Sequence, residues 1–330
     1  MPSLFRTVLL TAAAALGGLG ATAATAQSWQ PTRNVEYIVP AGPGAALDTA
    51  ARELKDLIDR MKLSPMPMLV SNKPGGAGMV AMGTLANHPG DGHMLMTLTH
   101  SSINNRLVGE VKLGYDDFTP LVTLFDEFIT VAVRADSPIR DGRDLVERLR
   151  KDPSALSIGI ATSIGNHIHV AIAKPLKVGG VEIAKLTVVP FKSSSESMTN
   201  LLGGHIDIVS ASAINVVAQL KAGKIRVIAV AAAERLGGDL ASIPTWREQG
   251  IDAVYGSSQG VLGAKGLTPA QVRYWEQTFK RATDTPQWAS FLAKNHWKSH
   301  FLESAPTRKY LDEEAGSAKL VLGELGLFKP

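Results

Sequence analysis

The sequence predicts an α/β fold of two domains, each a mostly parallel sheet flanked by helices, with a ligand cleft between them. Short runs of β-branched and aromatic residues alternate with helix-period apolar patterns through most of the chain, which is typical of βαβ units. Turns rich in Gly, Ser and Thr follow many of these runs, at the sheet edge where ligands bind in such folds. The length of 330 residues makes two domains the default.

The N-terminus has the pattern of a secretory signal peptide over residues 1–26. Arg6 supplies a positive charge, residues 8–19 are apolar, and Ala24-Thr25-Ala26 forms a small-residue cleavage site. The apolar stretch is too short for a stable membrane span, so we favour a cleaved leader over an uncleaved anchor. We therefore expect export, to a bacterial periplasm.

Composition excludes several classes of function. The chain has no cysteine, which excludes disulfides, thiolate nucleophiles and cysteine-ligated metals. The net charge of +4 comes without a run of Lys or Arg, which gives no support for nucleic-acid binding and weakly favours small anionic ligands. His167 and His169 are two positions apart on a predicted helix and cannot share one ion, so we expect no metal site and no cofactor.

The first predicted strand, turn and helix organise the rest of the chain. Residues 35–39 are predicted to form a strand, and Gly42 and Gly44 form a turn that exposes backbone N–H groups. The following helix has one apolar face, made by Leu47, Ala51, Leu54, Ile58 and Met61. Free N–H groups and the positive end of the helix dipole make such a turn a candidate anion site. The alternative is an ordinary βα unit without a ligand; the turn lacks the third glycine of a dinucleotide fingerprint.

The same alternation continues along the chain. Further strands are predicted at residues 67–70, 93–98, 118–123, 129–133, 156–161, 186–191, 206–212, 227–230 and 260–264, and three helices follow from residue 268 onward. We expect residues 27–131 and 253–330 to form domain 1 and residues 132–252 to form domain 2. The hinge is then near Ala132 and Ala253.

Several short segments occur in an order that covers nearly the whole mature chain. They include Pro40-Ala41-Gly42-Pro43-Gly44-Ala45-Ala46-Leu47-Asp48, Asn72-Lys73-Pro74-Gly75-Gly76-Ala77-Gly78, Val189-Pro190-Phe191-Lys192 and Leu201-Leu202-Gly203-Gly204-His205-Ile206-Asp207. As an ordered set they resemble the Bug family, the periplasmic substrate-binding proteins of tripartite tricarboxylate transporters. The resemblance implies a type II periplasmic-binding fold that closes on a di- or tricarboxylate and hands it to a membrane permease. We expect a monomer.

The resemblance also implies where the ligand binds. One carboxylate would lie on the loop of residues 41–48, with Asp48 holding an ordered water, and the facing loop would be residues 162–167. Two departures affect the pocket: Ser193-Ser194-Ser195 replaces the family's Gly-Gly, and Leu47 narrows the first loop. The expected ligand-binding residues are Ala41, Gly42, Gly44, Ala45, Ala46, Asp48, Ser101, Ser102, Thr162, Ser163, Gly165, Asn166, His167, Ser193, Ser194, Ser195 and Ser212.

Two other functions could use the same cleft. A receptor that presents its liganded form to a membrane sensor kinase would differ only in its partner. A hydrolase could use Ser163, His167 and Asp207, but Ser163 lacks the glycines of a nucleophile elbow. Residues 256–260 match the Gly-x-Ser-x-Gly pattern but precede a predicted strand, so we expect Ser258 in a polar turn. We therefore expect a binding protein and not an enzyme.

Overall fold

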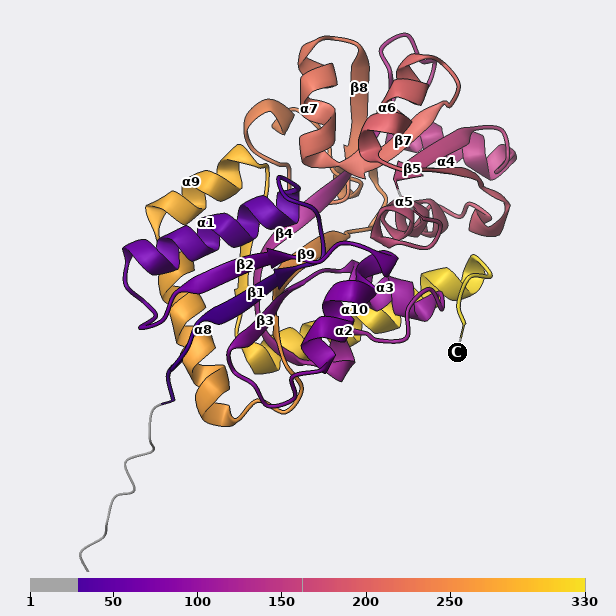
Figure 1. The fold of residues 1–330 in the computed structure, drawn as a ribbon. Coiled ribbons are helices and arrows are strands. Elements are labelled where there is room, and N and C mark those ends of the chain that lie inside the picture. The colour runs from indigo at the N-terminus through magenta and orange to yellow at the C-terminus, as the bar shows by residue number, and fades with distance from the viewer. Residues whose placement is uncertain (1–28, 162, 330) are drawn as a thin grey trace, which may run out of the picture.

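The computed structural model describes residues 29–161 and 163–329, so the predicted signal peptide lies outside the described residues. The ribbon has two lobes, and the first hundred described residues lie in one of them (Figure 1). Within the described ranges no helix is both long and apolar enough to cross a membrane.

The first lobe begins as the sequence predicts. Its elements are β1 (Val35–Val39), α1 (Ala46–Arg60), β2 (Met68–Asn72), α2 (Met79–Ala86), β3 (Met94–Leu98) and α3 (Ser101–Leu107). β1 lies between β2 and β3, and both neighbours run parallel to it. α1 covers this sheet because the middle of its apolar stripe, which includes Leu54 and Ile58, is buried against it. Met61, predicted as the last residue of the stripe, follows the helix and is exposed.

The second lobe repeats the pattern. Its elements are α4 (Gly142–Lys151), β5 (Ser157–Ala161), α5 (His167–Val178), β6 (Thr187–Phe191), α6 (Ser194–Leu202), β7 (Ile208–Ser212), α7 (Ala213–Lys221) and β8 (Ile225–Val230). β5 lies between β6 and β7 and is parallel to both. Polar side chains cap several helices; the Ser193 hydroxyl, for example, accepts from the Glu196 N–H at the start of α6.

One long strand connects the lobes. β4 (Thr119–Arg134) pairs antiparallel with β9 (Gly256–Gly263) in the first lobe and with β7 and β8 in the second. The sequence predicts two shorter strands here, but residues 124–128 also pair and the strand is continuous. The expected polar turn at Ser258 is wrong, because Ser258 lies inside β9 opposite Asp126. Burial between strands overrides the turn-like composition of this segment.

The strands in the described ranges join into one 10-stranded sheet. The order is β2-β1-β3-β9-β4-β7-β5-β6, and β8 pairs with β4 as a branch. β4 and β9 run antiparallel to their neighbours, so the parallel arrangement predicted from the sequence is found only in the outer strands of each lobe. The predicted α/β class is confirmed.

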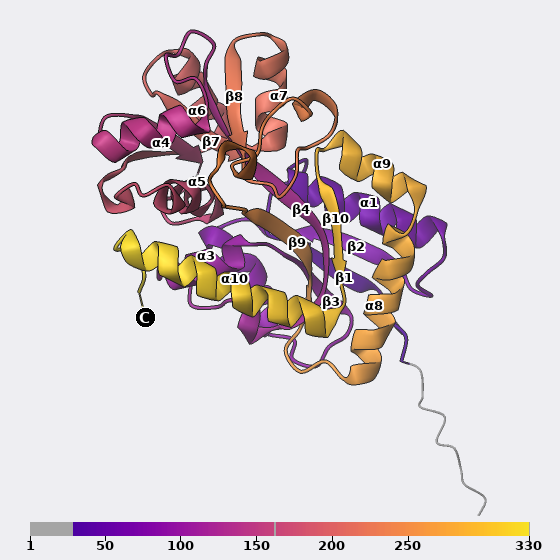
Figure 2. The same ribbon diagram turned by 180° about the vertical axis from the view of Figure 1, so that it is seen from behind.

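The C-terminal elements return to the first lobe. They are α8 (Pro269–Thr283), α9 (Pro286–Lys294), β10 (Lys298–Leu302) and α10 (Ser304–Glu324). α8 and α9 pack with α1, whereas β10, which the sequence does not predict, pairs with β4. Figure 2 shows α10 running along the back of the molecule, where it contacts α3 and α5. An ion pair of 2.5 Å joins Lys177 of α5 to Glu324 of α10. Short 3₁₀ helices occur at Gly76–Gly78, Tyr115–Asp117, Ile183–Lys185, Gly238–Leu240 and Arg247–Gln249.

Candidate functional site

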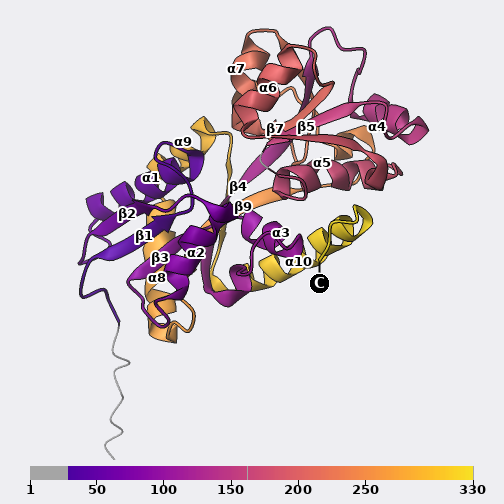
Figure 3. The same cartoon turned by 45° about the vertical axis from the view of Figure 1, so that its right-hand side comes forward.

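A cleft of about 490 Å³ lies where the loops of the first lobe face the start of α5. β4 and β9 run between the two lobes in Figure 3 and contribute the floor of this cleft. Its volume is in the range of small-molecule sites. The described residues that line it are Pro40, Ala46, Leu47, Gly75, Ala77, Gly78, Thr99, Ser101, Asn105, Glu110, Phe125, Glu127, Ser163, His167, Gln259 and Trp297.

The first turn of α1 forms one wall. Ala45 precedes the helix in an extended conformation, and its side chain makes no capping hydrogen bond. Ala46 and Leu47, the first two helical residues, line the cleft. The first N–H groups of a helix have no intrahelical acceptor, so this wall offers donors and the positive end of the dipole. Gly44 has φ +80°, which only glycine adopts readily.

Asp48 lies behind this wall and does not line the cleft. Its side chain is 2% exposed. One carboxylate oxygen accepts from the Gly44 N–H at 2.8 Å, and the carboxylate also accepts from Arg52 Nε at 2.9 Å and Asn72 Nδ2 at 2.9 Å. The hydrogen bond from Arg52 is the largest cause that lowers the pKa of Asp48 to about 2. Asp48 therefore fixes the loop, and its expected contact with a ligand-bound water remains a prediction.

The glycine turn before α2 forms a second part of the same wall. Gly75, Gly76 and Gly78 have φ of +118°, +55° and +97°, and Ala77 has φ of +52°. Gly75, Ala77 and Gly78 line the cleft. We did not predict these residues to bind the ligand, although a run of glycines is typical of a backbone segment that a ligand approaches closely.

Ser101 and His167, two of the expected ligand-binding residues, meet across the cleft. The Ser101 Oγ lies 3.1 Å from His167 Nδ1, so α3 and α5 are joined by a hydrogen bond. Burial lowers the pKa of His167 to about 4, and its ring is neutral at pH 7. Ser102 points the other way, because its hydroxyl donates to the Thr99 carbonyl at 2.6 Å.

The loop before α5 contributes less to the cleft than expected. Ser163 lines it, whereas Thr162 lies outside the described residues. Gly165 has φ +89° and packs against the first lobe; a Cβ there would lie 2.6 Å from Val108 Cγ1. Asn166 is buried and caps α5 by accepting from the His169 N–H at 3.0 Å.

The remaining predicted residues lie away from the cleft lining. Ser193 caps α6, and Ser194 and Ser195 are the first residues of that helix. Ala41, Gly42 and Gly44 shape the first loop behind Ala46; the Ala41 carbonyl, for instance, accepts from Asn72. Ser212 is buried at the end of β7, and its side chain hydrogen-bonds with Glu127. A ligand role for these residues stays a prediction.

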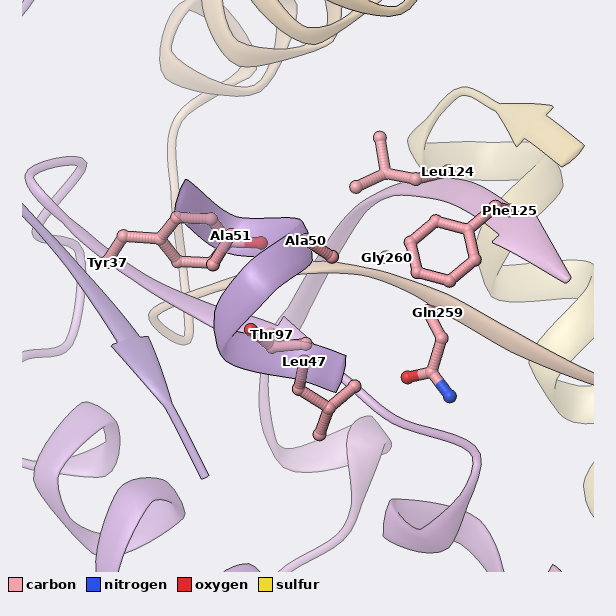
Figure 4. Close-up of a pocket in the computed structure, with 9 residues that line it drawn as sticks. All are labelled: Tyr37, Leu47, Ala50, Ala51, Thr97, Leu124, Phe125, Gln259 and Gly260. Atoms are coloured by element: carbon pink, nitrogen blue, oxygen red, sulfur yellow. The ribbon is translucent and has the colours of Figure 1, made fainter. Parts of the chain in front are cut away.

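The floor of the cleft was not predicted. Phe125 and Glu127 alternate with Asp126 along β4, so they share one face of the sheet, and Gln259 of the paired strand β9 shares it too. Figure 4 shows Phe125 and Gln259 beside the first turn of α1 at a small adjoining cavity of about 10 Å³. Trp297 stacks on Phe125 with ring centroids 4.4 Å apart. Glu127 was missed because it lies between the two strands predicted at residues 118–123 and 129–133, in a segment to which no element was assigned.

Ser163, His167 and Asp207 are not assembled into a triad. Asp207 accepts from the Ser157 N–H and hydroxyl at the start of β5, whereas Ser163 follows the end of that strand. Ser258 is fully buried on the opposite face of β9, where its hydroxyl hydrogen-bonds with Asp126 and lies 3.3 Å from His300 Nδ1 and 2.7 Å from Tyr310 Oη. This cluster does not line the cleft. Among the described residues, no group of three or more His, Asp or Glu could hold a metal ion.

Comparison with known proteins identifies the group to which this fold belongs. A family model described as "Tripartite tricarboxylate transporter family receptor" matches residues 51–327. The chain is 28% identical over 324 residues to a Cupriavidus necator protein named "UPF0065 protein in gbd 5'region", covering 97% of this chain and 96% of that one.

Solved structures show the same fold. A TctC solute-binding protein from Polaromonas without ligand has a TM-score of 0.75 at 24% identity, covering 89% of this chain and 99% of that chain. An R. palustris protein solved with adipate has a TM-score of 0.74 at 24% identity, covering 90% and 98%. The resemblance predicted from the ordered segments is confirmed, and the chain belongs to the tripartite tricarboxylate transporter receptor family.

Proposed function

We propose that this protein is a periplasmic receptor that captures a small di- or tricarboxylate and delivers it to the membrane permease of a tripartite tricarboxylate-type transporter. The observation that carries the proposal is the open first turn of α1 at the cleft wall. Ala45 makes no side-chain cap, and Ala46 and Leu47 line the cleft. Backbone N–H groups at a helix start bind carboxylates without a cationic side chain.

Related structures support the ligand class. The R. palustris relative of the same fold was solved with adipate, a dicarboxylate. The cleft of about 490 Å³ is large enough for a molecule of that size. The residues that we propose to contact the ligand are Ala46, Ser101, Ser163 and His167, together with the glycine turn at residues 75–78; their position in the cleft lining supports this proposal.

We also propose that the two lobes close on the ligand. The hydrogen bond between Ser101 and His167 already joins them on the cleft side, and Gly165 packs on Val108 behind it. Residues 27–131 with 253–330 and residues 132–252 would move as two bodies about the β4 and β9 crossings. Export by a cleaved leader and a monomeric state belong to the same proposal.

Isothermal titration of the mature protein against a carboxylate panel tests this function. The panel contains succinate, malate, adipate, citrate, aspartate and glutamate. We expect saturable binding of at least one member with one site per chain. Absence of binding to every member, with the protein shown to be folded by circular dichroism, would contradict the proposal. Copurification with permease subunits from membranes tests delivery to a transporter. Capture of a sensor kinase instead would replace the transporter in this proposal by a signalling partner.

We infer that the ligand is bound and released unchanged. Ser163 and His167 line the cleft, but Asp207, the acid considered with them as a triad, bonds with Ser157 at the far end of β5. Ligand recovered after prolonged incubation should give an unchanged NMR spectrum. Turnover that disappears in Ser163→Ala or His167→Ala would instead assign a hydrolase or isomerase to this cleft.

A further inference from the structure

We propose that the ligand carries an amino group as well as its carboxylates, and that Glu127 binds that amino group. This inference rests on the proposed function, because it names the substrate class of the same cleft. Glu127 lies at the middle of β4, where the strand passes from one lobe to the other, and its side chain lines the cleft floor.

The ionisable side chains in the cleft lining are acidic apart from one histidine. Of the described residues that line the cleft, none is Lys or Arg, whereas Glu110 and Glu127 are acidic. His167 adds no positive charge near neutral pH, because burial lowers its pKa. Arg52 of α1 is engaged by Asp48 behind the loop. Burial raises the pKa of the Glu127 carboxyl, and an ammonium group beside it would favour its ionised form. A ligand with carboxylates alone would bring more negative charge to this carboxyl and no cation.

Two amide side chains of the cleft lining have oxygens that accept no hydrogen bond within the part of the chain that the structure describes. Gln259 and Asn105 both line the cleft, are 5% and 6% exposed, and have side-chain carbonyl oxygens without a donor among the described residues. The orientation of the Asn105 amide follows from the hydrogen bond that its Nδ2 donates to the Ala77 carbonyl. Buried acceptors without donors are costly, so a ligand that brings N–H groups is favoured here.

Glu127 and Gln259 lie close enough on the sheet to accept hydrogen bonds from the same ligand group. In the register of the paired strands, Phe125 is opposite Gln259 and Glu127 is opposite Ser257. Glu127 and Gln259 are therefore diagonal neighbours on one face, within reach of a single ammonium group. Ammonium groups have three donors and no acceptor, which matches a carboxylate beside an amide oxygen.

The cleft thus has two complementary ends. The open first turn of α1 and the glycine turn before α2 supply N–H donors for a carboxylate, and the strand crossing supplies a carboxylate and an amide oxygen for an amine. An amino-substituted dicarboxylate satisfies both ends at once. The side chain of Ser212, which hydrogen-bonds with Glu127, holds the carboxyl group in place.

Titration with matched ligand pairs tests the inference. The pairs are aspartate with succinate and glutamate with glutarate, which differ only in the amino group. We expect the unmodified protein to bind the amino member of at least one pair at least tenfold more tightly. Equal binding, or preference for the unsubstituted acid, overturns the inference while the proposed function stands. If no member of either pair and no other carboxylate binds, the proposed function itself fails and the inference falls with it.

Glu127→Gln assigns the preference to one side chain. This change keeps the shape and a hydrogen-bonding partner for Ser212 but removes the charge. We expect affinity for the amino member to fall at least tenfold and affinity for the unsubstituted member to rise. Glu147→Gln, the same change on the exposed face of α4, is the matched control and should alter neither. An equal loss of affinity for both members of a pair would show that Glu127 is structural and would overturn its assigned role. The preference of the unmodified protein for the amino member is measured separately, without a variant.

Discussion

Asp48 is the residue on which the shape of the first cleft wall depends. Its carboxylate accepts hydrogen bonds from Gly44, Arg52 and Asn72, which hold a loop, a helix and a strand end together. The family resemblance assigned this aspartate to a ligand-bound water, and that role stays a prediction. Its contacts show that it holds the loop in position.

Asp48→Asn should lower the free energy of unfolding at pH 7 by on the order of 2 kcal/mol. The folded-state pKa is about 2 against a usual value of 3.8, so the ionised form is favoured by folding. This stabilisation is complete above pH 3.8 and is lost as the pH falls through 2. Urea unfolding at pH 7 and pH 3 measures it. Asp56→Asn, on the exposed face of α1, is the control, and an equal effect of the two variants would contradict the prediction.

Three histidines lie around the contact between the lobes: His100 and His169 are buried, and His167 is half-buried at the cleft. Burial lowers the pKa of His100 to about 3 and the pKa values of His167 and His169 to about 4. His169 Nδ1 accepts from the Gly165 N–H at 2.9 Å, which requires the neutral ring. Protonation is therefore opposed by both burial and this hydrogen bond.

Acid should destabilise the protein between pH 6.5 and pH 4. In this range the unfolded chain binds protons at these histidines and the folded chain does not, so the free energy of unfolding rises with pH. Urea unfolding at pH 7, 6 and 5 should show the decline. His169→Gln should reduce the slope by up to about 1.4 kcal/mol per pH unit. His88→Gln at an exposed position is the matched control, and a slope that His169→Gln leaves unchanged would show the assignment to be wrong.

At the scale of elements, the start of α1 is the proposed anion-binding group. Ala45 has φ −67° and ψ 160°, an extended conformation that tolerates a following proline. Proline is also well accepted at the first position of a helix, because that N–H has no intrahelical acceptor. The Ala46 N–H can therefore be removed without breaking the helix.

Ala46→Pro should weaken carboxylate binding by about 10–100-fold, the effect of losing one hydrogen bond of about 1.5–3 kcal/mol to a charged group. The melting temperature should stay within a few degrees of the unmodified protein. Ala46→Ser keeps the N–H and controls for a changed side chain at the cleft wall. Titration calorimetry and thermal unfolding measure both effects. Unchanged affinity in Ala46→Pro would remove the first turn of α1 from the site.

At the scale of the whole molecule, the cleft depends on contacts between distant parts of the chain. α10 packs on α3 of one lobe and α5 of the other, and Lys177 pairs with Glu324 across that contact. β4 belongs to both halves of the sheet. Ligand binding is therefore expected to change how the lobes sit together.

A bound carboxylate should stabilise and compact the protein. Ligand at 100 times its Kd adds about 2.7 kcal/mol to the free energy of unfolding, which corresponds to a rise of several degrees in melting temperature. Closure of the lobes should lower the radius of gyration in small-angle X-ray scattering. Stabilisation without compaction would contradict lobe closure but not binding. Ala46→Pro at the same ligand concentration should show a smaller shift.

Local chemistry explains which expectations agree with the structure. The predicted strand at residues 35–39 is β1, and the glycine turn after it leads into a helix at Ala46. The signals for these elements are β-branched residues, glycines and a helix-period apolar stripe, and each determines the backbone conformation over only a few residues. Ser101, Ser163 and His167, which the family resemblance assigns to the ligand site, line the cleft, because the ends of parallel strands share one edge. Ser258 was misplaced because the strand that contains it is stabilised by pairing with β4, which lies far away in the sequence.

The sequence by itself determined the fold class, the first strand, turn and helix, the absence of cysteine chemistry and the membership of the chain in its family. These features follow from short-range periodicity, from glycine and proline chemistry, and from composition. Only the tertiary structure decided that Asp48 turns behind the loop and that Glu127 and Gln259 reach the cleft floor. The side of a strand that faces a ligand depends on its register with partners more than a hundred residues away, and no local pattern encodes that register.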